Sequence, residues 1–180
     1  MPSANDPGNT PRSPLTVYPA DYVAPGERGG GKLAAKVGVG AAALIVAMVG
    51  AFEGKRNDPY RDIVGVWTVC YGETNVAMRH YSDAECKAML ENSLADYAGP
   101  VLARNPELRG HDPQLAAAVS LAYNIGPAAY RKSSVARLFS AGQWRAACDA
   151  FLRWSYAGGK QVKGLLRRRQ SERAMCLRGL

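Results

Sequence analysis

The side chains of this chain best suited to catalysis are two carboxylates and a hydroxyl. Glu53, Asp62 and Thr68 fall within one short stretch, separated by eight and then five intervening residues. Hydrolysis of a glycosidic bond needs one carboxyl group that protonates the leaving oxygen and a second that activates water or stabilises the transition state. The two groups must have different environments, so that one is protonated while the other is ionised. The three residues therefore indicate a glycosidase site.

The neighbours of the two carboxylates predict different roles for them. Glu53 follows the apolar Phe52, and burial there would raise the pKa of its carboxyl, as a general acid requires. Asp62 lies in a polar turn that suits an ionised base, and Thr68 could hold the attacking water. A transglycosylase, which uses no water, is a related alternative that the pair Asp62 and Thr68 disfavours. The spacing alone is weak evidence, because many chains contain it by chance.

The elements that must position these residues are a hairpin and a set of helices. β-forming side chains over residues 60–71 predict a short β-hairpin that holds Asp62 and Thr68. Capping residues and apolar periodicity predict helices over residues 82–97, 114–125, 133–142, 143–154 and 165–177. One small antiparallel sheet followed by a mainly helical lobe predicts an α+β fold.

An apolar segment, residues 33–52, ends directly before Glu53. Twenty residues form a helix of about 30 Å, which just spans the hydrocarbon core of a bilayer. The apolar side chains favour insertion by a total of roughly 2–4 kcal/mol, which is weak. A buried helix of a soluble domain is the alternative. Because the basic residues lie on its N-terminal side, the positive-inside rule predicts a cytoplasmic N-terminus and residues 53–180 across the membrane.

Composition divides the chain further. Residues 1–31 are rich in proline and glycine, which predicts a disordered tail and linker before a membrane helix over residues 32–52 and a catalytic domain over 53–180. The net charge of +8 is concentrated in residues 131–180, which contain twelve basic and two acidic side chains. This excess predicts an anionic partner: nucleic acid, lipid or wall polymer. No nucleic-acid motif accompanies it, so nucleic acid is disfavoured.

The final helix, residues 165–177, is the most basic element, and its charges predict a solvated face. It also keeps open a different class of function, a non-catalytic protein that binds cell wall or membrane.

The four cysteines show no metal-binding pattern. Cys70, Cys86, Cys148 and Cys176 lack the close spacing of zinc ligands, so no metal site is predicted. Four cysteines allow three full pairings, and the sequence does not choose among them. Buried free thiols are an equal alternative, whereas export of the domain would permit disulfides.

The residues around the candidate site resemble the motif of the phage-type lysozymes, glycoside hydrolase family 24. The matching residues are Glu53-Gly54, Tyr60, Asp62, Gly65, Trp67-Thr68, Tyr71-Gly72 and Thr74, with further matches at 120–126, 147–149, Trp154 and 164–173. The resemblance covers about residues 53–178. It implies a lysozyme-like fold and hydrolysis of the β-1,4 bond between N-acetylmuramic acid and N-acetylglucosamine in peptidoglycan, without metal or cofactor.

The resemblance also implies roles for individual residues. Glu53 would be the general acid, Asp62 would position or activate water, and Thr68 would support that water, with inversion of configuration. Residues that fall where family members line the sugar cleft are Tyr123, Asn124 and Ser134, for which helix packing or capping is the alternative. Glu73 departs from the family, because the better-known relatives often have a histidine there that can pair with a carboxylate.

Together with the apolar segment, the motif resembles the signal-arrest-release endolysins. These enzymes are exported by the host secretion system and held in the inner membrane until lysis. The resemblance implies a monomer that is tethered through residues 33–52 with its N-terminus in the cytoplasm, then released to the periplasm, where it meets peptidoglycan strands. The segment contains no cysteine, which excludes a thiol switch through it. The closer match is to members activated when the segment leaves the bilayer and refolds beside the catalytic domain. Residues 49–52 cannot lie in lipid and in the domain at once, so Glu53 is expected to be misplaced while tethered.

Overall fold

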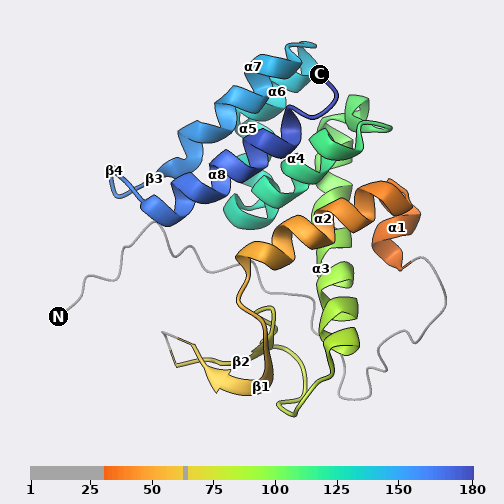
Figure 1. The fold of residues 1–180 in the computed structure, drawn as a ribbon, viewed down its shortest axis with the longest axis vertical. Coiled ribbons are helices and arrows are strands. Elements are labelled where there is room, and N and C mark those ends of the chain that lie inside the picture. Colours follow the sequence, from red (N-terminus) through yellow and green to blue (C-terminus); the bar gives the residue numbers. More distant parts are fainter. Residues whose placement is uncertain (1–30, 63–64) are drawn as a thin grey trace.

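The computed structural model describes residues 31–62 and 65–180, and the predicted tail therefore lies almost wholly outside the described residues. A small β-hairpin lies beside a larger helical body (Figure 1). The hairpin consists of β1 (Arg56–Arg61) and β2 (Trp67–Cys70), which pair antiparallel. A second, two-residue hairpin, β3 (Tyr156–Ala157) and β4 (Lys160–Gln161), was not predicted. The predicted α+β class, with a small antiparallel sheet followed by a mainly helical lobe, is confirmed.

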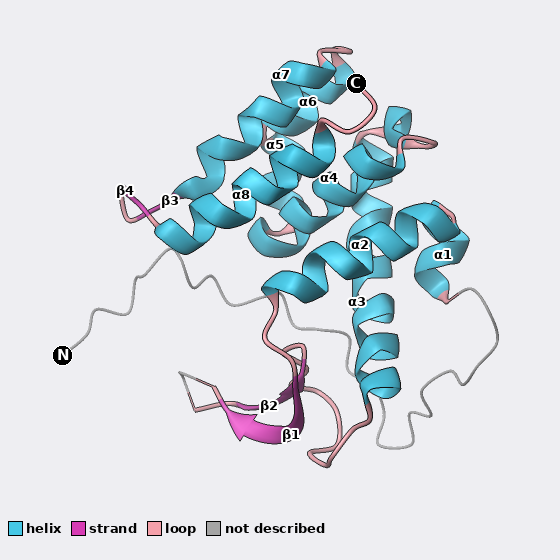
Figure 2. Ribbon diagram, in the orientation of Figure 1, coloured by secondary structure: helices cyan, strands magenta, loops and turns pink. Residues whose placement is uncertain are grey.

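Helices make up most of the described chain (Figure 2). They are α1 (Lys32–Val37), α2 (Val39–Phe52), α3 (Asp83–Arg104), α4 (Asp112–Ile125), α5 (Pro127–Lys132), α6 (Ser134–Ser140), α7 (Trp144–Ala150) and α8 (Lys163–Cys176), with 3₁₀ turns η1 (Pro106–Leu108) and η2 (Phe151–Ser155). The predicted capping box at the start of α3 is present, because the Ser82 hydroxyl accepts from the Glu85 N–H and the Glu85 carboxylate accepts from the Ser82 N–H.

The apolar segment folds against the helical body. It forms two helices rather than the single helix predicted over residues 32–52, because Gly38 adopts φ +86°, a conformation that favours glycine and interrupts the helix. Leu33, Ile45 and Val49 are buried in one core with residues of α3 and α4. Within the described residues, no helix has the length and hydropathy needed to cross a membrane. The apolar segment is thus part of the core in this structure.

All four cysteines are paired. Cys70–Cys86 joins the end of β2 to the first turn of α3, and Cys148–Cys176 joins α7 to the end of α8. The alternative of buried free thiols is wrong, and the structure selects one of the three possible pairings. The two disulfides close loops with sequence separations of 16 and 28, so each restricts the unfolded chain.

Replacing Cys148 and Cys176 together by alanine is expected to lower the free energy of unfolding by about 3.5 kcal/mol, because that disulfide closes a loop with a sequence separation of 28. Denaturant unfolding without reductant measures the loss. Complete reduction of both disulfides in the wild-type protein should lower the free energy of unfolding by more than the double substitution does. A variant as stable as the wild type would contradict the assignment.

Candidate active site

The chain leaves the helical body for the β1–β2 hairpin at the end of α2 (Figure 1), and Glu53 is the C-cap residue there. Its extended backbone (φ −90°, ψ 126°) ends α2, and its N–H donates to the carbonyl of Val49 at 3.1 Å. The side chain is only 12% exposed. The apolar segment therefore positions Glu53 directly, since α2 is the helix that this residue terminates.

Arg168 of α8 is the polar partner that holds Glu53. Its Nη1 donates to Glu53 Oε1 at 3.1 Å, and its guanidinium lies over the ring of Phe52, 4.9 Å from the ring centroid. The sequence interpretation missed this residue. The solvated face predicted for the final helix is wrong at Arg168 and Arg169, both of which are buried. The spacing of Arg168 and Glu172, one helical turn apart, was the available signal for an internal ion pair.

A buried ion-pair network anchors Arg168. Glu172 is fully buried, and its Oε1 accepts from Ser120 Oγ at 2.7 Å, from Arg169 Nη2 at 3.0 Å and from Arg168 Nε at 3.3 Å. Burial raises the pKa of the Glu172 carboxyl, an effect that the two arginines and the serine oppose. Burial also lowers the pKa of Arg169 to about 10, which still leaves it charged at neutral pH. The network fixes α8 against α4 and keeps the Arg168 guanidinium beside Glu53.

Asp62 and Thr68 both belong to the β1–β2 hairpin. Tyr60 pairs with Thr68 in the strand register, and the Asp62 N–H donates to the Val66 carbonyl at 2.9 Å. Asp62 directly follows β1, and Thr68 lies within β2. The Val66 N–H donates to Asp62 Oδ1 at 2.9 Å, and the buried Thr68 hydroxyl donates to the Val66 carbonyl at 3.1 Å. These contacts hold both side chains at the turn of the hairpin.

The three residues expected to bind sugar all belong to the helical body. Tyr123 is buried, with its ring 4.9 Å from that of Tyr97. Asn124 is exposed, and its Oδ1 accepts from Arg169 Nη2 at 3.0 Å. Ser134 is the first residue of α6. Tyr123 therefore has a packing role and Asn124 a hydrogen-bonding role within the helical body. Contact of the three residues with sugar stays a prediction.

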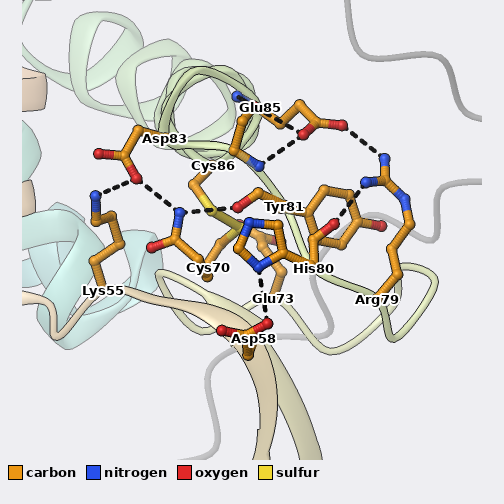
Figure 3. Close-up of a disulfide and its surroundings, with 12 residues drawn as sticks. Lys55, Asp58, Cys70, Glu73, Arg79, His80, Tyr81, Asp83, Glu85 and Cys86 are labelled. Carbon is orange, nitrogen blue, oxygen red and sulfur yellow. Dashed lines mark hydrogen bonds and ion pairs between the residues drawn. A yellow bond between two sulfur atoms is a disulfide. The ribbon is translucent and has the colours of Figure 1, made fainter.

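Glu73, the departure from the family pattern, is a buried residue that links the hairpin to α3. Its backbone pairs with Val69 through two hydrogen bonds of 2.9 Å, and Ser93 Oγ donates to its Oε1 at 3.3 Å. It lies beside the disulfide of Cys70 and Cys86 (Figure 3). The hydroxyl of Ser93 is therefore one partner of this carboxylate, in a position where relatives are expected to have a histidine.

Exposed ion pairs also connect the hairpin, the loop after it and the start of α3 (Figure 3). His80 lies 2.8 Å from Asp58, and Arg79 lies 2.7 Å from Glu85. The hydrogen bond from Arg79 is the largest of the causes that lower the pKa of Glu85 to about 2. Such solvent-exposed pairs each contribute little to stability. In the described part of the chain, no cluster of three His, Cys, Asp or Glu side chains could hold a metal ion.

The sequence is similar to a known protein family and to known relatives. A family model described as phage lysozyme matches residues 50–172. The chain is 41% identical over 158 residues to the SAR-endolysin of Enterobacteria phage P21, covering 82% of this chain and 94% of the relative. It is 43% identical over 132 residues to the SAR-endolysin of Bacteriophage PS119, covering 71% of this chain and 77% of the relative.

Solved structures of phage endolysins and lysozymes have a similar fold. The active form of the P1 phage endolysin Lyz matches with a TM-score of 0.67 and 25% identity, covering 82% of this chain and 92% of the other. A variant of P22 lysozyme matches with a TM-score of 0.66 and 28% identity, covering 74% of this chain and 94% of the other.

Proposed function

Since the chain belongs to the phage lysozyme family, it is a glycoside hydrolase that cleaves peptidoglycan, and we propose that Glu53, Asp62 and Thr68 are its catalytic residues. The observation that supports this most strongly is the environment of Glu53. Glu53 ends α2 directly before the hairpin of Asp62 and Thr68. Its carboxylate is largely buried and is oriented by Arg168 at 3.1 Å. The motif spacing and this geometry point to the same residue.

In the proposed reaction, Glu53 donates its proton to the glycosidic oxygen as the bond from that oxygen to the anomeric carbon breaks. Asp62 takes a proton from the water whose oxygen bonds to the anomeric carbon from the opposite side, and Thr68 positions that water. Arg168 donates hydrogen bonds but accepts none, so it cannot take the proton from Glu53. It orients Glu53 and stabilises the carboxylate that forms when the proton has left, an interaction that strengthens toward the transition state.

The test is an assay of the purified protein on isolated sacculi, with release of reducing sugar ends as the readout. Hydrolysis releases new reducing ends and clears the suspension. A non-catalytic wall or membrane binder, the alternative function, would sediment with the sacculi and release none. That second result would reject the enzymatic function.

We also propose that the protein begins tethered to the inner membrane through residues 33–52, with residues 1–31 in the cytoplasm, and is then released to the periplasm. Three observations support the proposal. Relatives named SAR-endolysin are 41–43% identical, two disulfides suit an oxidising compartment, and the fold matches an endolysin described as active. Leu33, Ile45 and Val49 contribute to the core here, so they cannot lie in lipid while Glu53 is in place.

Two substitutions that strengthen membrane insertion without disturbing the docked helix test this coupling. Ala43 and Ala47 are exposed on α2, and changing both to leucine favours insertion by about 1 kcal/mol. We expect roughly a fivefold larger membrane-bound fraction and later lysis in cells, measured by fractionation and culture turbidity. Gly38 and Gly40 are unsuitable, because Gly38 needs a positive φ and a Cβ on Gly40 would collide with the Asp112 carboxylate.

The matched control changes Ala103 and Ala146 to leucine, since both are exposed alanines outside the apolar segment. It should leave fractionation and lysis time unchanged. An unchanged membrane fraction in the Ala43→Leu/Ala47→Leu variant would contradict the tether. A larger membrane fraction with unchanged lysis time would contradict the coupling of release to activity.

A further inference from the structure

The β3–β4 hairpin and the first turns of α8 form a basic surface, here named the cationic edge and defined by Lys160, Lys163 and Arg167. All three side chains are exposed, and no carboxylate of the described residues pairs with any of them. Two exposed apolar side chains accompany them, Tyr156 at 58% and Val162 at 40% exposure. The Val162 N–H donates to the carbonyl of residue 155 at 2.8 Å, which ties the hairpin to the start of α8.

The acidic residues that could neutralise this surface are engaged elsewhere. Residues 131–180 contain only Asp149 and Glu172 as acidic side chains. Asp149 lies 2.7 Å from Arg173, and Glu172 is buried in the network behind the site. The cationic edge therefore has an unbalanced positive charge that fits an anionic ligand.

The cationic edge borders the catalytic carboxylate. Arg168, which contacts Glu53 at 3.1 Å, directly follows Arg167, and Lys163 begins the helix about 7.5 Å before it along the axis. Figure 1 shows the β3–β4 hairpin at the same end of α8. Gly164 lies one turn before Arg168 on the same face, and a Cβ there would meet nothing within 4 Å. The surface of α8 is thus uncovered at Gly164, between the cationic edge and Arg168.

We propose that the cationic edge binds the carboxylates of the peptide stems on the peptidoglycan strand held in the active site, with Tyr156 and Val162 against the apolar parts of the stems. This inference rests on the proposed function. N-acetylmuramic acid bears the stems, so a strand cleaved at Glu53 presents their carboxylates close to the reacting bond. The position beside Glu53 favours this ligand over a lipid surface, which would not need to approach the catalytic carboxylate.

The experiment compares two substrates: glycan strands with peptide stems, and the same strands after an amidase has removed the stems. The wild-type enzyme should have the higher kcat/KM on the strands with stems. In the variant Lys160→Gln/Lys163→Gln/Arg167→Gln, the ratio of the two kcat/KM values should fall roughly tenfold, through KM on the strands with stems. Added salt should reduce the wild-type preference, because these charges are exposed.

The control variant Arg137→Gln/Arg145→Gln/Arg178→Gln removes the same charge from α6, α7 and the C-terminus, away from the β3–β4 hairpin (Figure 1). It should keep the wild-type ratio. An equal fall of the ratio in both variants would overturn the proposal, because the net charge of the protein alone would then explain the preference. An unchanged ratio in the first variant, together with lost binding to anionic lipid vesicles, would assign the cationic edge to a membrane surface instead. A wild-type protein inactive on both substrates would reject the proposed function itself.

Discussion

Glu53→Gln is expected to lower kcat for peptidoglycan hydrolysis by roughly 10²–10⁴-fold, the range that a general acid contributes. An amide cannot supply the proton that the leaving oxygen needs. The substitution keeps the size of the side chain and an oxygen that can accept from Arg168 Nη1, which contacts Glu53 at 3.1 Å in the wild type. The fold should therefore be retained. Release of reducing ends by the purified variant measures the loss, and its thermal midpoint checks the fold.

Glu91→Gln is the matched control, because Glu91 is a partly buried carboxylate of α3 that lies 3.9 Å from the Lys87 ammonium, away from the candidate site. It should retain wild-type kcat. If Glu53→Gln cleared purified walls as fast as the wild type, the assignment of the general acid would be wrong. Wall binding without release of reducing ends, in the wild type and the variant alike, would favour the non-catalytic alternative.

Glu172→Ala is expected to lower the free energy of unfolding by about 3–5 kcal/mol, because it leaves the buried Arg169 without its carboxylate and removes one of the two that Arg168 contacts. Glu172 is fully buried and contacts both Arg168 and Arg169. The loss of this anchor should also lower kcat, since Arg168 orients Glu53. Denaturant unfolding gives the stability, and wall hydrolysis gives the second readout.

Asp149→Ala provides the comparison, because Asp149 also pairs with an arginine of α8 but in solvent. It should cost less than about 1 kcal/mol. If Glu172→Ala does not fold, the double variant Arg169→Met/Glu172→Leu should recover stability, since apolar residues of similar volume can replace a buried ion pair. Equal, small losses for Glu172→Ala and Asp149→Ala would contradict the role of the buried network.

Local signals made much of the fold predictable. The capping box of Ser82 and Glu85 marks the start of α3, and the β-forming run after Tyr60 contains the β2 strand. The catalytic candidates were also visible, because Glu53, Asp62 and Thr68 follow one another along a helix end and a single hairpin. Such short-range patterns depend on neighbouring residues alone, so a sequence contains all the information they need.

Long-range contacts explain what the sequence did not reveal. Arg168 reaches Glu53 across a separation of 115 residues, and a run of three arginines suggests a solvated helix rather than a buried pair. The pairing of Cys70 with Cys86 depends on how the hairpin meets α3. The break at Gly38 allows α1 and α2 to pack on the domain in different directions, which an apolar run does not show.

In the proposed mechanism, water cleaves the glycosidic bond while Glu53 protonates the leaving oxygen. The most direct measurement is mass spectrometry of the muropeptides that the wild-type protein releases in water labelled with oxygen-18. The expected product is reducing-end N-acetylmuramic acid that has gained one labelled oxygen, with no such product from the Glu53→Gln variant. Unlabelled anhydro ends, lighter by one water, would contradict it, because that product forms without water.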